Sequence, residues 1–381
     1  MADLLKSSWS NVDTGELRFI LYERIGRPGQ YRDRANNPGK FYLPLADSTC
    51  RVELTFSEDK QLVAIEPGPA FDAAQWDEIV GEIESTGRIK VGRDCSFSSF
   101  RVAGSWQGSR SGVQILPPPA DAPVAPVEMA EHPFILEFPV KVSDRWPITN
   151  HRRMTQHRSL TWLLNILLAG RTCVQSRRPR HLWATVPGDA NFDVKWVQEF
   201  FFAKFGAAVA NALSPPSTQL MKVVEPTSYF TTVVHDGRSL EVPADLDDLI
   251  CCYTQLTPTN RATFDRGSFW MDMASRQWAI SLSASFASLV IAIEALGDRR
   301  KGPTARFHDY LAQYAPNASL QDRGKKMYAL RSDILHGSGL MEMDQDADSG
   351  WSPPEQNDKD IMEELWRLTK LSMLNWLKNP P

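Results

Sequence analysis

Apolar residues in the C-terminal third of the chain recur at the spacing of amphipathic helices. A first stripe consists of Leu246, Leu249, Ile250, Tyr253 and Leu256. Thr257 and Pro258 then form an N-cap and N1 pair that begins another helix. A second stripe consists of Phe286, Leu289, Val290, Ile293 and Leu296. Gly297 is a suitable C-cap for this stripe. Because the residues on nearly all sides of this helix are small or apolar, we expect it to be central in a bundle.

Two further helices complete this block. One extends from about Asp322 to His336 and ends at Gly337. The last extends from about Asp358 to Lys378, and acidic residues at its start suit the helix macrodipole. Its apolar face consists of Met362, Leu365, Trp366, Thr369, Met373 and Trp376. The pattern therefore predicts an all-α bundle over residues 243–381.

Residues 1–116 have a β-rich pattern instead. Arg51–Phe56 and Gln61–Glu66 flank a polar tetrapeptide, which is typical of a hairpin. Trp76–Glu84 has helical spacing, with Asp72 as the expected N-cap. The remaining short apolar runs, the last three of them expected strands, are Leu17–Tyr22, Ile89–Val91, Phe100–Ala103 and Gly112–Leu116.

The middle of the chain gives mixed signals. Residues 117–133 are rich in Pro and Ala and predict an extended linker. Residues 134–242 form a mixed α/β region, and they belong either to a domain of their own or to one sensor domain with 1–116. Its expected elements are strands at 134–142, 221–224 and 229–234, helices at 159–169 and 194–213, and a turn at Asp236–Gly237. The fold class is thus α+β, with a mixed β-rich/α N-terminal region followed by a C-terminal all-α bundle.

Composition narrows the class of protein. Hydrophobic residues make up 42% and charged residues 23%, which is ordinary for globular domains. The net charge of −4 shows no global excess of cations, so any nucleic-acid site must be local. Five cysteines without a C-x-x-C pattern argue against structural zinc and fit a reducing compartment. The start of the chain has no signal-peptide pattern, and its apolar runs are too short to span a bilayer, so we expect a cytoplasmic protein.

One spacing carries candidate chemistry. Arg331 and His336 form an Arg-x4-His motif at the end of the predicted Asp322–His336 helix. Arg152 and His157 share this spacing, and one accidental match is expected among 42 basic residues and seven histidines. Context favours Arg331–His336, because this pair closes a helix in the all-helical block.

These residues resemble the Apea-like branch of the HEPN superfamily over roughly residues 245–378. The resemblance is carried by the helix Ser285–Leu296 with its embedded Glu294, the basic segment 305–307, and the run from Met327 to Gly337. It implies a helical, commonly homodimeric bundle. It also implies endoribonuclease activity without metal or cofactor, in bacterial antiphage defence. The N-terminal region would then sense a ligand or protein trigger. Many HEPN proteins have Asn or Asp directly after the arginine, whereas this chain has Ser332 followed by Asp333.

The two motif residues suit this chemistry. Near neutral pH, histidine is the usual general acid or base, and His336 lies at a helix C-terminus that favours its protonated form. The guanidinium of Arg331 matches phosphate oxygens. The 2′-hydroxyl of RNA is the nucleophile, so the expected products are a 2′,3′-cyclic phosphate and a 5′-hydroxyl. Residues five apart lie about 140° around a helix from each other, and a two-fold homodimer would bring copies of both into one cleft.

Several residues are expected to support the motif. Glu294 lies on an apolar helix and needs a partner, for which Arg331 is one candidate. Tyr328 could stack on a base, with core packing as the alternative. Cations that could follow an RNA backbone, or simply form a solvated face, are Arg299, Arg300, Lys301, Arg306, Arg323, Lys325 and Lys326. An acidic segment after residue 341 opposes RNA binding if it folds over the site.

Other interpretations stay open. Arg331 can pair with Asp333 or Glu294 while His336 merely caps its helix. The bundle would then be a non-catalytic HEPN module for dimerisation or for nucleotide or RNA binding. A third possibility is a regulated partner of a nucleotidyltransferase encoded elsewhere. Pairing of Arg331 with a carboxylate would favour the binding module.

Overall fold

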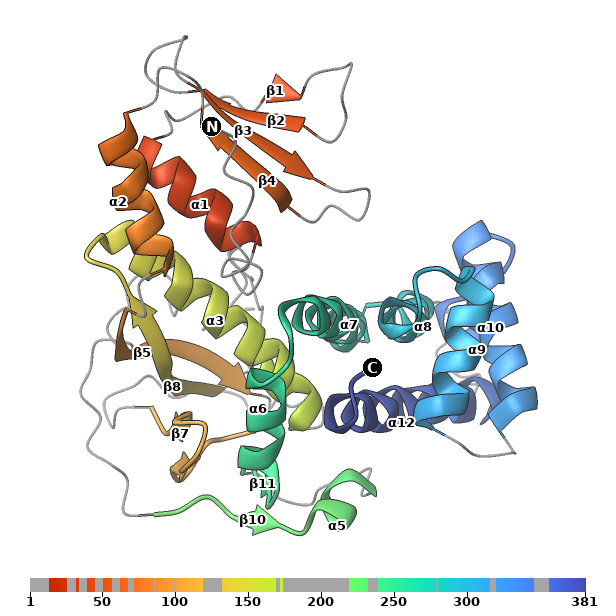
Figure 1. Ribbon diagram of the computed structural model, residues 1–381. Helices are drawn as coiled ribbons and strands as arrows, with labels where there is room; N and C mark the ends of the chain where they lie inside the picture. Colours follow the sequence, from red (N-terminus) through yellow and green to blue (C-terminus); the bar gives the residue numbers. More distant parts are fainter. Residues whose placement is uncertain are drawn as a thin grey trace, which may run out of the picture. The chain divides into compact units, whose positions relative to one another are not determined.

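The computed structural model describes most of the chain and divides it into two compact units (Figure 1). The described residues are 14–25, 32–33, 40–44, 51–56, 62–67, 72–84, 87–98, 100–118, 132–168, 172–173, 219–231, 239–278, 280–315, 320–345 and 356–381. The first unit comprises Met1–Gly92 and Pro139–Gln156, and the second comprises Arg93–Phe138 and His157–Pro381. Together they contain helices and antiparallel strands, so the protein is an α+β protein.

The first unit has a four-stranded antiparallel sheet in the order β1-β2-β3-β4. The strands are β1 Arg32–Asp33, β2 Lys40–Pro44, β3 Arg51–Phe56 and β4 Leu62–Pro67. The predicted pairing of the third and fourth strands is confirmed, with Leu54 opposite Ile65. The turn that joins them lies outside the described residues.

Two helices of this unit pack against each other, α1 (Thr14–Ile25) and α2 (Ala73–Glu84). The expected helix around Trp76 is confirmed, and the Asp72 carboxylate accepts a hydrogen bond from the amide of Ala74 as an N-cap. The run at 17–22, which belongs to a region with a β-rich pattern, is part of α1. Leu17, Ile20 and Leu21 are buried, which is the i, i+3, i+4 spacing of one helix face.

Three elements pass from one unit into the other: β5 (Arg88–Ser98), β8 (His132–Val142) and α3 (Trp146–Leu167). The two strands join β6 (Trp106–Gln107), β7 (Gln114–Leu116) and β9 (Thr172–Cys173) in a sheet of order β6-β7-β8-β5-β9. The expected strands near 89–91, 112–116 and 134–142 are therefore confirmed. Residues 100–103 form only an isolated bridge between Arg101 and Ser239, so the strand prediction there was wrong.

A small motif precedes the C-terminal helices. Strands β10 (Val223–Val224) and β11 (Val242–Pro243) pair in parallel, and α5 (Pro226–Thr231) follows β10. The strand prediction for 229–234 was wrong for its described part, which is helical. Pro226 fits the first helical turn, and the Glu225 carboxylate accepts from the amide of Ser228. The predicted helix at 194–213, the turn at 236–237 and most of the linker at 117–133 lie outside the described residues.

The remaining helices of the second unit lie in the region predicted to be helical, although those at 303–314 and 342–345 were not predicted individually. They are α6 Leu246–Thr254, α7 Pro258–Gln277, α8 Leu282–Leu296, α9 Pro303–Tyr314, α10 Leu320–His336, α11 Glu342–Gln345 and α12 Gln356–Lys378. Thr257 caps α7 by accepting from the amide of Asn260, with Pro258 at N1, as expected. Within the described chain, the search for a helix that could cross a membrane finds none.

α8 is the central helix of this block, as its apolar composition predicts. It packs against α7, α9, α10, α11 and α12, and it is buried on most of its surface. Phe286 is fully buried on it, and nearby Phe264 and Trp376 stack with ring centroids 5.6 Å apart. Burial of this apolar surface is the main stabilising term for the bundle.

The N-terminus of α8 is closed by two side chains. Ser281 is the N-cap and accepts from the amide of Ala284. The Asp344 carboxylate, which arrives from α11, accepts from the amides of Leu282 at 3.0 Å and Ser283 at 2.7 Å, and from the Ser281 hydroxyl. Partial burial raises the pKa of Asp344, but bonds from Ser283, Ser281 and Leu282 outweigh it and hold the pKa below its usual value.

This contact predicts a pH-dependent stability. Asp344→Ala should lower the free energy of unfolding by about 1 kcal/mol, because amides at the start of α8 lose their acceptor. The contribution should be present above about pH 4 and lost as the pH falls through the lowered folded-state pKa. Urea unfolding measured across this pH range tests it. Glu363→Ala, which removes an exposed carboxylate from α12, should have little effect.

Candidate functional site

The Arg-x4-His motif occupies the last two turns of α10, and the helix ends in a Schellman motif. Gly337 adopts φ 71°, the left-handed conformation that favours glycine. Its amide donates to the carbonyl of Ile334, and the Ser338 amide donates to the carbonyl of Asp333. The predicted cap at Gly337 is thus confirmed, and it leaves His336 exposed as the final helical residue.

Arg331 does not project freely, because it forms an ion pair with Glu294 on α8. Its Nη2 donates to Glu294 Oε2 at 3.0 Å, and the two side chains are only 16% and 11% exposed. Burial raises the pKa of Glu294, although the charges of Arg331 and Arg306 oppose this. Arg331 Nε and Glu294 Oε1 are buried without a hydrogen-bond partner. The pair therefore retains polar atoms that a ligand or water could satisfy.

Tyr328 packs beside this ion pair. The Arg331 guanidinium lies over the Tyr328 ring, 5.5 Å from its centroid. On α9, the rings of Phe307 and His308 lie 5.6 Å and 5.9 Å from the same ring. Burial lowers the pKa of His308, against the charge of Asp309. The half-buried tyrosine is thus held between α9 and the guanidinium.

The structure brings Arg331, Glu294 and Tyr328 together, but not His336. In the part of the chain that the structure describes, no hydrogen bond or ion pair joins His336 to Arg331. Asp333 is exposed and accepts from the Ser338 hydroxyl, and Ser332 is half-buried. Of the two carboxylates considered as partners for Arg331, Glu294 is the one that binds it.

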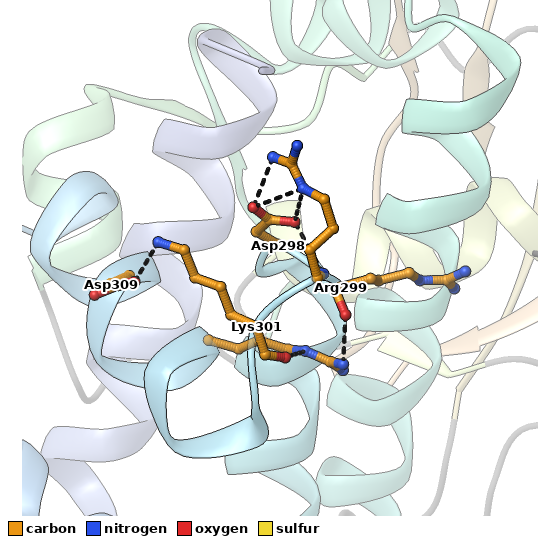
Figure 2. Close-up of polar contacts among 6 residues, drawn as sticks. Asp298, Arg299, Lys301 and Asp309 are labelled. Carbon is orange, nitrogen blue, oxygen red and sulfur yellow. Dashed lines mark hydrogen bonds and ion pairs between the residues drawn. The ribbon is translucent and has the colours of Figure 1, made fainter.

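Carboxylates of the loop between α8 and α9 and of α9 itself pair with two of the loop's cations (Figure 2). Arg300 binds Asp298 through two nitrogens, and these bonds lower the pKa of Asp298 to about 2. Lys301 Nζ lies 2.5 Å from Asp309. Arg306 donates to the backbone carbonyls of Lys301 and residue 299. Three of the four cations predicted here to bind RNA are therefore engaged by groups of the loop or of α9.

The other predicted cations differ from one another. Arg299 makes no side-chain hydrogen bond or ion pair among the described residues, and Figure 2 shows it extending away from the rest of the cluster. Lys325 and Lys326 are exposed on α10. Arg323 pairs with Glu364 of α12. Arg299 is thus the loop cation available for a ligand.

Neither residue of the second Arg-x4-His match is available. Arg152 is buried and pairs with Glu16. His157 is buried, and its Nε2 lies 2.8 Å from Ser96 Oγ, while its Nδ1 lies 3.7 Å from Asp94. This order resembles a Ser-His-Asp triad, but Ser96 is fully buried and Phe138 stacks on the imidazole. We therefore assign these three residues a structural role.

The sequence pattern did not predict the contacts of three residues that lie at or near the site. Asp344 was one of several acidic residues, and nothing local indicated that it caps α8. His308 and Arg266 are single polar residues on helices, and only the packing shows what surrounds them. Among the described residues, no cluster of three His, Cys, Asp or Glu side chains could hold a metal ion.

The Arg331–Glu294 pair gives a stability prediction. Arg331→Met should lower the free energy of unfolding by about 2–4 kcal/mol near neutral pH, because it leaves a buried carboxylate without a cation. Without Arg331 the pKa of Glu294 should rise further, so the loss should shrink as the pH falls from about 7 to about 5. Urea unfolding at several pH values measures both effects.

The controls are a second variant and a second ion pair. Glu294→Gln combined with Arg331→Met should recover part of the loss, because no buried charge is left. Arg110→Met breaks the exposed pair with Asp248 and should cost less than about 1 kcal/mol. Equal losses for Arg331→Met and Arg110→Met would argue against a buried, coupled pair.

Comparisons of the chain with known proteins found no relative. No family model matches the chain, and no curated protein or solved structure is significantly similar to it.

Proposed function

We propose that residues 243–381 form a HEPN-like bundle that cleaves RNA without a metal ion, and that the preceding residues sense a trigger, as in antiphage defence. The observation that carries the proposal is the exposed His336 at the end of α10, the helix whose Arg331 is paired with Glu294 of α8. A carboxylate holds the guanidinium in one orientation, and the same helix ends five residues later at an exposed histidine. A buried second residue that orients an arginine is typical of prepared oxyanion sites.

The proposed step balances without a co-reactant. The 2′-oxygen of RNA attacks the adjacent phosphorus while its proton passes to a base, which is a neutral imidazole or water. The bond from phosphorus to the 5′-oxygen breaks, and protonated His336 supplies a proton to that leaving oxygen. Arg331 stabilises the charge on the phosphate oxygens. The products are a 2′,3′-cyclic phosphate and a 5′-hydroxyl.

A homodimer would solve the separation of the two residues. Along a helix they are offset by about 7.5 Å and about 140°, so they do not share a face. Leu335 and Leu340, on either side of the helix end, are 48% and 50% exposed. Apolar side chains at such a position suit an isologous contact that places His336 of one copy near Arg331 of the other.

A binding module is the second candidate, and one observation favours it. Arg331 is mostly buried and is already paired with a carboxylate, which is what a purely structural arginine would do. In that case the bundle would bind RNA or a nucleotide, or mediate dimerisation, and His336 would do no chemistry. Cleavage and binding assays separate the two candidates.

RNA cleavage tests the catalytic role of His336. We expect the wild-type protein to cut single-stranded RNA in the presence of EDTA, and His336→Ala to lower the rate by about 100-fold or more. Because His336 is exposed, the variant should keep its thermal unfolding curve. Ser338→Ala, two residues further on, should cut normally. Cutting that EDTA abolishes, or that survives in His336→Ala, would reject this mechanism. Binding without cutting would support the module.

Light scattering tests the dimer. The wild-type chain should have the mass of two copies, and Leu335→Asp combined with Leu340→Asp should shift it toward one copy, because charges would be buried in the interface. Leu371→Asp is the matched control, since Leu371 is 43% exposed on α12 and outside the proposed contact. A wild-type protein that is monomeric at all concentrations would contradict the shared cleft.

A further inference from the structure

α7 and α8 form an antiparallel hairpin whose alignment is fixed near the C-terminus of α8. Gly267 on α7 faces Leu296 and Ala292, and a Cβ at that glycine would lie 3.0 Å from Leu296 Cγ. Ser285 Oγ donates to the carbonyl of Ala274 nearer the other end. The residue before the glycine, Arg266, is therefore level with the last turn of α8, where the loop containing Arg299 begins.

Arg266 leans toward that loop. Its Nη2 donates to Thr263 Oγ1 at 2.9 Å, so the side chain extends along α7 toward the N-terminus of that helix. The loop that contains Arg299 begins beside this end of α7. Burial lowers the pKa of Arg266, the positive charge of Arg299 lowers it further, and the charge of the neighbouring Asp265 opposes both. Like charges repel unless an anion or water separates them.

Acidic side chains near these arginines are already engaged. Asp265 accepts from the Tyr253 hydroxyl at 2.7 Å and from Ser159 at 3.2 Å. In the loop, Asp298 binds Arg300 and Asp309 binds Lys301. Neither Arg266 nor Arg299 has an ion pair with a carboxylate in the part of the chain that is described.

The loop backbone at Arg299 is held by Arg306 of α9. Arg306 donates to the carbonyls of both Arg299 and Lys301, which ties the loop backbone to the start of α9. Figure 2 shows the Arg299 side chain directed away from the paired charges of the loop. Arg299 is exposed, so a solute can reach it.

We propose that Arg266 and Arg299 form a site for a phosphate group, held between two guanidinium groups. Guanidinium pairs suit phosphate because their donors match its oxygens. The site is separate from the motif, since Glu294 is about 200° around α8 from both Ala292 and Leu296, which face α7. The proposal does not depend on cleavage. The phosphate can belong to a polynucleotide backbone or be free inorganic phosphate.

Two binding measurements test the site. The first uses a short fluorescein-labelled 2′-O-methyl oligonucleotide, which cannot be cleaved, and records anisotropy at several salt concentrations. Arg299→Gln should weaken binding several-fold and reduce the slope of log K against log salt by about one phosphate contact. The second measures the rise in melting temperature that inorganic phosphate causes. A rise for wild type that Arg299→Gln removes would show that free phosphate suffices.

The matched control is Arg300→Gln, which removes an exposed arginine of the same loop that is paired with Asp298. It should change neither the slope nor the phosphate effect. Arg266→Gln should reproduce the effect of Arg299→Gln, and if it unfolds, Arg299→Gln carries the test alone. Arg299→Gln that behaves like Arg300→Gln in both measurements would overturn the proposal. RNA cleavage by His336→Ala tests the proposed function and not this site, so its outcome is independent of both binding measurements.

Discussion

A carboxylate that lies in the middle of an apolar bundle needs a cation, and Glu294 imposes this requirement on the helices around α8. Arg331 meets it, so α10 can pack on α8 only where its guanidinium reaches that carboxylate. Tyr328 lies one turn earlier and packs against the same guanidinium. The orientation of the motif helix, including its exposed histidine, therefore follows from one buried charge on its neighbour.

α8 also separates charges of opposite sign. The carboxylate of Asp344 closes its N-terminus, and a loop rich in arginine and lysine follows its C-terminus. With fifteen residues, the helix holds these groups about 22 Å apart. The arrangement matches the helix dipole at both ends. Asp344, which belongs to the acidic segment expected to repel RNA, is bound to amides at the opposite end from the free arginine.

Periodicity predicted the helices well because their burial is one-sided or complete. The stripe that begins at Phe286 falls within α8, and the stripe that begins at Leu246 falls within α6 except for Leu256, which follows the end of that helix. The caps at Thr257 and Gly337 are confirmed. Residues 229–231 were misread as strand because an aromatic pair favours strands, while the decisive residue was the proline before them. The site was predictable only in part. Candidate partners of Arg331 could be named from sequence, but Asp344, His308 and Arg266 gain their roles from residues far away in the chain.

The α7–α8 hairpin can be aligned in only one way. Ser285 and Ser288 donate to Ala274 and Gln277 on α7, while Gly267 makes room for Leu296 at the other end. A slip of one turn would withdraw both hydroxyls from their acceptors and set a bulkier side chain against Leu296. The distance between Arg266 and Arg299 along the hairpin is therefore set by three uncharged residues. They are Gly267, Ser285 and Ser288.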